Sequence, residues 1–389
     1  MRETYACGVD EGAKTVPPPQ IPLAFVGTAL LMLGATLLWI LLGNLAPLAL
    51  LHALIVGVFL MVAMGLIYQF VPVVAMAPLR WPQAAFVHLA LAVVGTACIV
   101  GGFQMVNFTL VRLGGSFLAA GVLLQAIVLG VTVRGRKPPA PALGAVLSLP
   151  WLLLTIGIGI WLADRFARGY TVGDVARYHA LVGLAGFFGT LVTAVTFRLM
   201  RMFERVNVEA RISVLAIAVT IATLVALASG ALGGYALLAL AIAVGAGVFA
   251  VARARNPAYQ RETFAYGVTS AAGALAASAA YTAGAFEMAA AFAVWYYIGT
   301  AVVGYLQRIV PFVWWIRRSH REGVKNIPTL AEMNDSRLGY VILGLWVAAG
   351  MLWLAQPEKR FAAAVALAAW AMLIVQLQRP FTAHKAHRD

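Results

Sequence analysis

Long apolar runs, separated by short stretches with Pro, Gly or charge, dominate the chain. Twelve of these runs reach the length of a membrane helix, near 21–43, 48–71, 84–106, 108–133, 143–163, 176–200, 210–230, 233–252, 264–284, 286–310, 336–355 and 360–378. A helix needs about 20 apolar residues to cross the hydrocarbon core of a bilayer. The pattern therefore predicts an all-α integral membrane protein with twelve transmembrane helices.

The breaks between the runs leave no room for a soluble domain. We predict a tail over 1–20, a single membrane domain over 21–378 and a second tail over 379–389. The longest break, 311–335, begins with aromatic side chains and continues with basic ones, which is typical of a cytoplasmic segment at the membrane–water interface. The first tail carries acidic residues and prolines before any apolar run, a pattern unlike that of a cleavable signal peptide.

Composition and charge sharpen this picture. Hydrophobic residues make up 62% of the chain and charged residues 11%, whereas a soluble domain is about half apolar and about a quarter charged. The loops between the predicted helices, counted from the N-terminus, lie alternately on the two sides of the membrane, and the even-numbered loops share a side with the two tails. Of the 28 Lys and Arg, all but six fall in or near the tails and the even-numbered loops. The six others are Arg112, Arg165, Arg168, Arg177, Lys359 and Arg360. The positive-inside bias then predicts that both termini are cytoplasmic. The net charge of +14 is thus explained by basic residues on the cytoplasmic side of the bilayer. We therefore expect the lipid bilayer, and no nucleic acid, as a partner.

A repeat links three of the predicted helices. The runs that end at Pro72 and Pro311 both carry a glycine seven residues before that proline, and the run that ends at Arg201 has the same frame with alanine in place of glycine. These anchors are 129 and 110 residues apart, and each interval contains four helices. We therefore predict three pseudo-equivalent units of four helices, in which the second, sixth and tenth helices correspond.

Two histidines fall at matching places in this repeat. His52 lies twenty residues before Pro72, and His179 lies twenty-two before Arg201. Both helices are predicted to run from outside to inside, so both side chains would lie one to two turns below the outer boundary and face a common interior. A neutral imidazole inside a membrane is a ligand for haem iron or copper, or else bonds to a neighbouring helix. We take His52 and His179 as the candidate metal ligands.

Other polar residues carry weaker indications. His88 is predicted near the cytoplasmic face, where an interfacial structural role fits it best. Glu287 is the only acid within or bordering a predicted helix, and a helix-start carboxylate is favourable there. The predicted core thus lacks the chain of carboxylates that proton pumps use as relays.

Lys359 and Arg360 stand in a short outer loop between the last two predicted helices. Basic side chains stabilise carboxylates, so these two residues could bind haem propionates. The alternative is that they only anchor the helix ends at the interface.

The residues assembled so far resemble subunit I of the haem-copper oxidases, above all its short divergent members of the cbb-type and NnrS-like kind. The similarity rests on three segments, 51–74, 178–188 and 307–314, which look like the family's second, sixth and tenth helices. The resemblance implies twelve helices in three groups of four in a bacterial inner membrane. It also implies b-type haem and copper as cofactors, with His52 matching a haem ligand and His179 a copper ligand.

The chain departs from the family pattern where the metals should be held. Ala291 stands where the tenth helix should carry a histidine, and neither 285–310 nor 210–230 contains one. A copper ion with one protein imidazole is not a catalytic centre. The sequence therefore weighs against oxygen reduction by a haem-copper pair.

Three functions remain open from the sequence. The first is an oxidase-like protein without the oxidase centre, which keeps a b-type haem or a metal ion for respiratory redox chemistry, nitric-oxide response or metal handling. The second is a permease on the same scaffold. The third is a structural subunit that joins other respiratory or redox membrane subunits.

Overall fold

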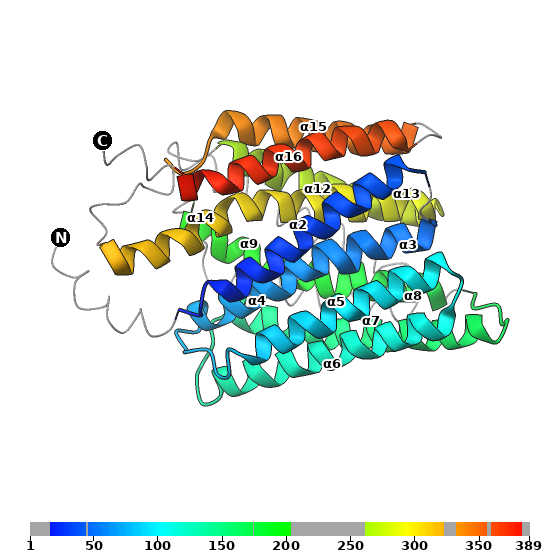
Figure 1. The fold of residues 1–389 in the computed structure, drawn as a ribbon, viewed down its shortest axis with the longest axis horizontal. Helices are drawn as coiled ribbons and strands as arrows, with labels where there is room; N and C mark the ends of the chain where they lie inside the picture. The colour runs from blue at the N-terminus through cyan, green and yellow to red at the C-terminus, as the bar shows by residue number, and fades with distance from the viewer. Residues whose placement is uncertain are drawn as a thin grey trace. The chain divides into compact units, whose positions relative to one another are not determined.

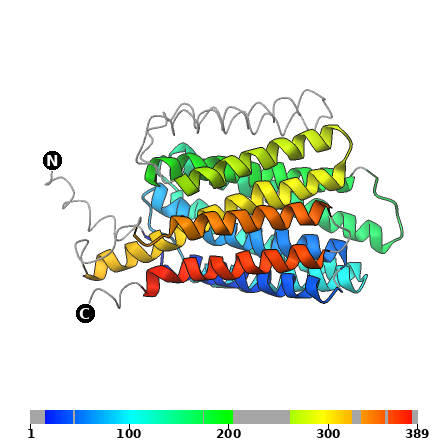
Figure 2. The ribbon, with the colours of Figure 1, turned by 90° about the horizontal axis from the view of Figure 1, so that it is seen from above.

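The computed structural model describes residues 16–43, 46–173, 175–203, 261–322, 332–355 and 359–382. Within these ranges all regular structure is helical and there is no β-strand, as Figures 1 and 2 show. The prediction of an all-α protein is therefore confirmed for the described part of the chain.

Nine helices in the described ranges are long and apolar enough to cross a membrane, which makes the chain a membrane protein in contact with lipid. A further long helix, α12 (Arg261–Thr282), is rich in Ala, Gly, Ser and Thr and is not among them. The predicted helices 210–230 and 233–252 lie outside the described residues. The count of twelve and the cytoplasmic position of both termini therefore stay predictions.

The chain divides into two compact units. The first comprises residues 1–29 and 46–195, and the second comprises residues 30–45 and 196–389. Helix α2 (Gln20–Leu41) contributes its beginning to the first unit and its remainder to the second. These packing units differ from the three predicted four-helix groups, because a repeat in sequence records equivalent helices and not the helices that pack together.

The first unit is built from helices of alternating direction that lie side by side (Figure 1). After α2 it contains α3 (Pro47–His52), η1 (Ala53–Leu60), α4 (Met61–Val74), α5 (Ala84–Gln104), α6 (Phe108–Val133), α7 (Ala140–Ala167), α8 (Val175–Leu181), η2 (Val182–Gly189) and the start of α9 (Thr190–Phe203). Glycines let α5 and α6 approach closely, since a Cβ atom on Gly95 would lie 2.8 Å from the Gly114 carbonyl oxygen. Close contact through small residues is a usual way for helices to associate in lipid.

The second unit follows the same construction. Its described helices are α12, α13 (Phe286–Ala291), η3 (Phe292–Gly299), α14 (Thr300–Glu322), α15 (Ser336–Ala355) and α16 (Arg360–Thr382), with α15 and α16 packed side by side (Figure 2). Trp295 and Trp346 join η3 to α15, because their rings stack 4.3 Å apart and each indole N–H donates to the backbone carbonyl of the other residue.

Three π-helices support the predicted repeat. Each of η1, η2 and η3 is eight residues long. Each begins 19 residues before its anchor at 72, 201 or 311 and ends 12 residues before it. The π-helix is rare and is frequent at functional sites. The same register in three places indicates that these long helices are equivalent in local structure.

The ends of two repeat helices differ from the prediction. Helix α14 continues through Pro311 to Glu322, whereas the sequence pattern placed its end at 310 and an interfacial segment over 311–335. Helix α4 likewise passes through Pro72 and ends at Val74. Proline removes one backbone hydrogen bond but does not end a membrane helix when neighbouring groups satisfy the freed carbonyl. The Val-Pro pair therefore marks a register position rather than a terminus.

Candidate functional site

His52 and His179 lie together in the first unit. His52 is the last residue of α3, directly before η1, and His179 lies in α8, shortly before η2. Their ring centroids are 6.4 Å apart and their ring planes differ by 22°. The structure thus brings together the two histidines that the repeat predicted to face a common interior, while their role as metal ligands stays a prediction.

A backbone carbonyl orients each imidazole. Nδ1 of His52 lies 2.8 Å from the carbonyl oxygen of Leu48, and Nδ1 of His179 lies 3.0 Å from that of Thr155. A carbonyl oxygen only accepts hydrogen bonds, so Nδ1 carries the proton in both rings and Nε2 keeps its lone pair. Neither Nε2 has a hydrogen-bond partner in the described part of the chain. This is the arrangement of a histidine that ligates a metal through Nε2.

Small and aromatic neighbours shape the space around the pair. The ring of Phe103 in α5 lies 4.6 Å from that of His52. Gly159 in α7 leaves the room that His179 occupies, since a Cβ atom there would lie 2.9 Å from the imidazole Cε1. Four helices, α3, α5, α7 and α8, therefore fix the two rings from different sides.

Two imidazoles that bind one metal ion from opposite sides provide a reference for this spacing. A metal–nitrogen bond of about 2.0 Å on each side puts the two ring centroids about 6.3 Å apart, close to the observed 6.4 Å. The described residues contain no group of three or more His, Cys, Asp or Glu that could hold a metal ion. The described donor set is therefore two imidazoles, which is too few for the three-histidine copper of an oxidase centre.

Lys359 and Arg360 belong to the second unit. The Lys359 ammonium group donates to the carbonyl oxygen of Trp353 and lies 5.3 Å from the centre of the Trp353 ring. The Arg360 guanidinium lies against Gly43, which has a positive φ of 79° after the end of α2. Both contacts are of the kind expected from residues that anchor helix ends. The binding of haem propionates by this pair stays a prediction.

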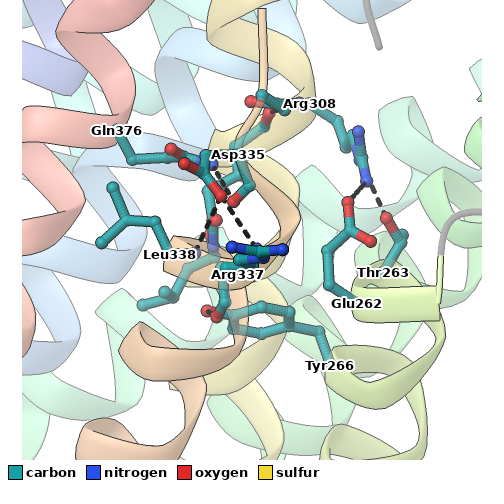
Figure 3. Close-up of polar contacts among 12 residues, drawn as sticks. Glu262, Thr263, Tyr266, Arg308, Asp335, Arg337, Leu338 and Gln376 are labelled. Carbon is teal, nitrogen blue, oxygen red and sulfur yellow. Dashed lines mark hydrogen bonds and ion pairs between the residues drawn. The ribbon is translucent and has the colours of Figure 1, made fainter. Parts of the chain in front are cut away.

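A buried ion pair forms a second candidate site, in the second unit (Figure 3). Arg308 in α14 binds the carboxylate of Glu262 in α12, and the two side chains are only 5% and 7% exposed. The Arg308 Nε donates to the Thr263 hydroxyl at 2.8 Å. Buried charges inside a helical bundle are costly unless paired, and they often mark function in membrane proteins.

The hydropathy pattern gave no sign of this pair, and the prediction that Glu287 is the only acid within or bordering a helix is wrong, because α7 contains Asp164 and α12 contains Glu262. Helix α12 begins at Arg261, three residues earlier than expected, so Glu262 lies in its first turn. Glu287 is exposed in the first turn of α13. The polar residues at the start of α12 lowered the apparent hydropathy there, and Arg308 opposite was the available signal for a partner.

A close approach of α12 and α14 creates the ion pair. A Cβ atom on Gly304 would lie 2.8 Å from Cβ of Tyr266. Glu262 lies one turn before Tyr266, and Arg308 lies one turn after Gly304, so two antiparallel helices in contact at Gly304 bring the charges together. The glycine of the repeat thus positions the site.

Backbone groups around the start of α15 surround the same region. The Tyr266 hydroxyl donates to the Gly339 carbonyl at 2.9 Å, and the Asn334 side-chain amide donates to the Gln307 carbonyl at 2.7 Å. The cluster therefore joins α12, α14 and α15 through directed hydrogen bonds as well as charge.

Asp335 caps α15 beside this cluster (Figure 3). Its carboxylate accepts from the backbone N–H groups of Leu338, at 3.2 Å, and Arg337, at 2.9 Å. Arg379 in α16 lies 3.0 Å from the other carboxylate oxygen. The Leu338 N–H, the Arg337 N–H and the Arg379 charge lower the pKa of Asp335 by stabilising its ionised form.

No protein-family model matches this chain, and no curated protein matches it in sequence. The two sites described above are therefore interpreted from their own geometry.

Proposed function

We propose that this chain is an inner-membrane protein of bacteria, with both termini cytoplasmic, that resembles oxidase subunit I and binds a b-type haem or a copper ion between His52 and His179. The observation that carries the proposal is the 6.4 Å separation of two imidazoles whose Nδ1 atoms are both held by carbonyls. The iron or copper would supply one-electron chemistry for respiratory redox reactions, nitric-oxide response or metal handling.

The proposal differs from the roles that the resemblance implies. In the family pattern His52 would serve a haem and His179 a separate copper. The short distance between the two rings supports one shared metal instead. The described residues offer no third side-chain ligand of the His, Cys, Asp or Glu type. The proposed protein is therefore not a terminal oxidase.

The absorption spectrum and metal content of the purified protein test the proposal. We expect about one iron or copper per chain, with a Soret band if the metal is haem iron. His52→Ala and His179→Ala should each remove most of it, because a single remaining imidazole binds weakly. His320→Ala, which removes a histidine from the second unit, should leave the metal content unchanged.

Free imidazole separates loss of a ligand from loss of the fold. It should restore metal binding to a folded His52→Ala protein by filling the space that the side chain left. The metal site would be ruled out if protein purified from native membranes shows no Soret band and contains neither iron nor copper. Equal metal content in both alanine variants and the parent would do the same.

A permease is the second candidate function, and the Glu262–Arg308 pair supports it. Intramembrane ion pairs of this kind occur on solute and ion pathways. Stabilisation of the protein in detergent by one solute, at unchanged metal content and reduced in Glu262→Gln, would favour transport. Co-purification with cytochromes would instead favour a structural subunit of a respiratory complex.

A further inference from the structure

Three polar side chains are fully enclosed where α4, α5 and α6 meet in the first unit. Tyr68 and Gln125 are 0% exposed and His88 is 1% exposed. The sequence pattern predicted a structural role for His88 near the membrane interface; the structure shows that His88 is enclosed within the bundle, near the start of α5, and its depth in the membrane stays a prediction. None of the three takes part in the histidine pair or in the Glu262–Arg308 site.

Contacts between their helices bring the three side chains near one another. The rings of Tyr68 and His88 have centroids 5.8 Å apart. Gly121 leaves the room for His88, because a Cβ atom there would lie 2.6 Å from the imidazole Cδ2. Gln125, one turn beyond Gly121, donates from its amide to the carbonyl oxygen of Met64, one turn before Tyr68, at 2.9 Å.

Each of these side chains has a buried polar atom without a partner. The Tyr68 hydroxyl, His88 Nδ1 and Gln125 Oε1 have no hydrogen bond within the part of the chain that the structure describes. Buried polar groups in proteins almost always have partners, and protein or ordered water supplies them. Three unpaired atoms on neighbouring helices therefore need partners that the described residues do not supply.

We propose that Tyr68, His88 and Gln125 form an internal binding site for water. The site offers a hydroxyl that donates and accepts, an imidazole nitrogen and an amide oxygen that accepts, and water can satisfy all three because it both donates and accepts. A neutral hydroxyl, imidazole and carboxamide provide no carboxylate for a cation and no guanidinium for an anion. A buried water typically makes about three such hydrogen bonds.

Radiolytic hydroxyl-radical footprinting of the full-length protein in nanodiscs tests this site. Radicals form from water at the place where it is bound, so Tyr68 and His88 should be oxidised although neither is exposed. Phe187 is the control, because it is also 0% exposed and is apolar. We expect at least a tenfold faster oxidation of Tyr68 and His88 than of Phe187. Equal, slow oxidation of all three would overturn the proposal.

A variant shows whether the cluster itself holds the water. Gln125→Leu removes one acceptor at similar volume and should lower the oxidation of His88 several-fold, while the oxidation of an exposed residue such as Tyr178 stays unchanged. Unchanged oxidation of His88 in this variant would contradict the site. If Gln125→Leu fails to fold, a second experiment on the parent protein takes its place. In this experiment the protein is mixed with H₂¹⁸O shortly before irradiation. Slow incorporation of ¹⁸O at Tyr68 is expected, and incorporation as fast as at exposed Tyr178 would contradict a bound water.

Discussion

The long helices of the first and third repeats share one backbone plan and treat polar groups in opposite ways. Tyr68 and Gln69 stand four and three residues before Pro72, where Gln307 and Arg308 stand before Pro311. Arg308 is held by Glu262 and Thr263. The Tyr68 hydroxyl and both polar atoms of the Gln69 amide are buried without a partner in the described residues. A repeated frame thus fixes where polar side chains stand, and the neighbouring helix decides whether they are satisfied.

The other end of the two helices shows the same contrast. His52 and Ala291 both lie twenty residues before the anchor and directly before a π-helix. Only the first frame gains a second imidazole, from His179. A polar residue of the third repeat helix forms an ion pair, whereas a histidine of the first repeat helix forms a pair of possible metal ligands with His179. We expect the two frames to respond differently to substitution.

The largest expected effect is loss of half of the ion pair. Arg308→Met leaves the Glu262 carboxylate buried and unpaired and should destabilise the protein by about 3–5 kcal/mol. The double variant Arg308→Met with Glu262→Leu should recover most of this loss. Thermal unfolding in detergent measures both. Arg317→Met, at an exposed position of the same helix, should change stability by less than about 0.5 kcal/mol. Equal stability of all these variants would refute a strongly coupled pair.

The next effect should be the same in both repeats. Gly65→Ala and Gly304→Ala each press a methyl group against an aromatic Cβ, that of Phe25 or of Tyr266, and should cost about 1–3 kcal/mol. Gly344→Ala in α15, where nothing lies within 4 Å, is the matched control and should be neutral or slightly stabilising. Sensitivity at only one of the two glycines in thermal unfolding would break the equivalence of the frames.

A third substitution probes the histidine pair without removing a ligand. Gly159→Ala places a methyl group 2.9 Å from Cε1 of His179, so it should displace the ring and weaken metal binding about 10–100-fold. Gly157→Ala, two residues away in α7, meets nothing within 4 Å and should bind metal like the parent. Metal titration compares the two. If both variants bind alike, His179 does not hold the metal.

The smallest effect compares a charged cap with a neutral one. Asp335→Ala and Asn107→Ala each remove a helix cap, of α15 and of α6, and should each cost about 0.5–2 kcal/mol at neutral pH. The pKa of Asp335 is lowered in the fold. Its contribution is therefore complete above the unfolded pKa of about 3.9 and declines as the pH falls through the folded value.

The cost of Asp335→Ala should accordingly shrink when the pH is lowered from 6 to 3, while the cost of Asn107→Ala should not change. Thermal unfolding of both variants across this range checks the difference. A cost of Asp335→Ala that is independent of pH would show that its charge contributes nothing to the cap.

Local patterns predicted the helices well where hydropathy alone decides. The ranges 108–133 and 336–355 agree with α6 and α15 to the residue. The predicted helix ends at Pro72 and Pro311 were wrong. The local sequence shows where a proline stands, whereas the neighbouring helices determine whether the helix continues through it. The repeat also predicted that His52 and His179 would face a common interior, since similar offsets on equivalent helices give similar depth, and the two rings do lie close together.

Contacts between helices could not be predicted from these local patterns. The pairing of Glu262 with Arg308 depends on the close contact that Gly304 makes with α12. Gly304 lies 42 residues after Glu262 in the sequence, and hydropathy gave no sign of this contact. His88 appeared interfacial from its place in the chain and is enclosed in the structure, because Gly121 on another helix makes room for its ring.

The sequence by itself determined that this is a helical membrane protein with a repeated frame, because the thickness of the bilayer sets the length of an apolar run and the repeat sets the register along each helix. Only the tertiary structure decided the surroundings of the polar groups: two imidazoles lie 6.4 Å apart, one ion pair is buried, and three buried polar atoms have no partner in the described residues. Depth along a helix is a local property of the chain, whereas the rotation and approach of one helix toward another depend on the side chains of both.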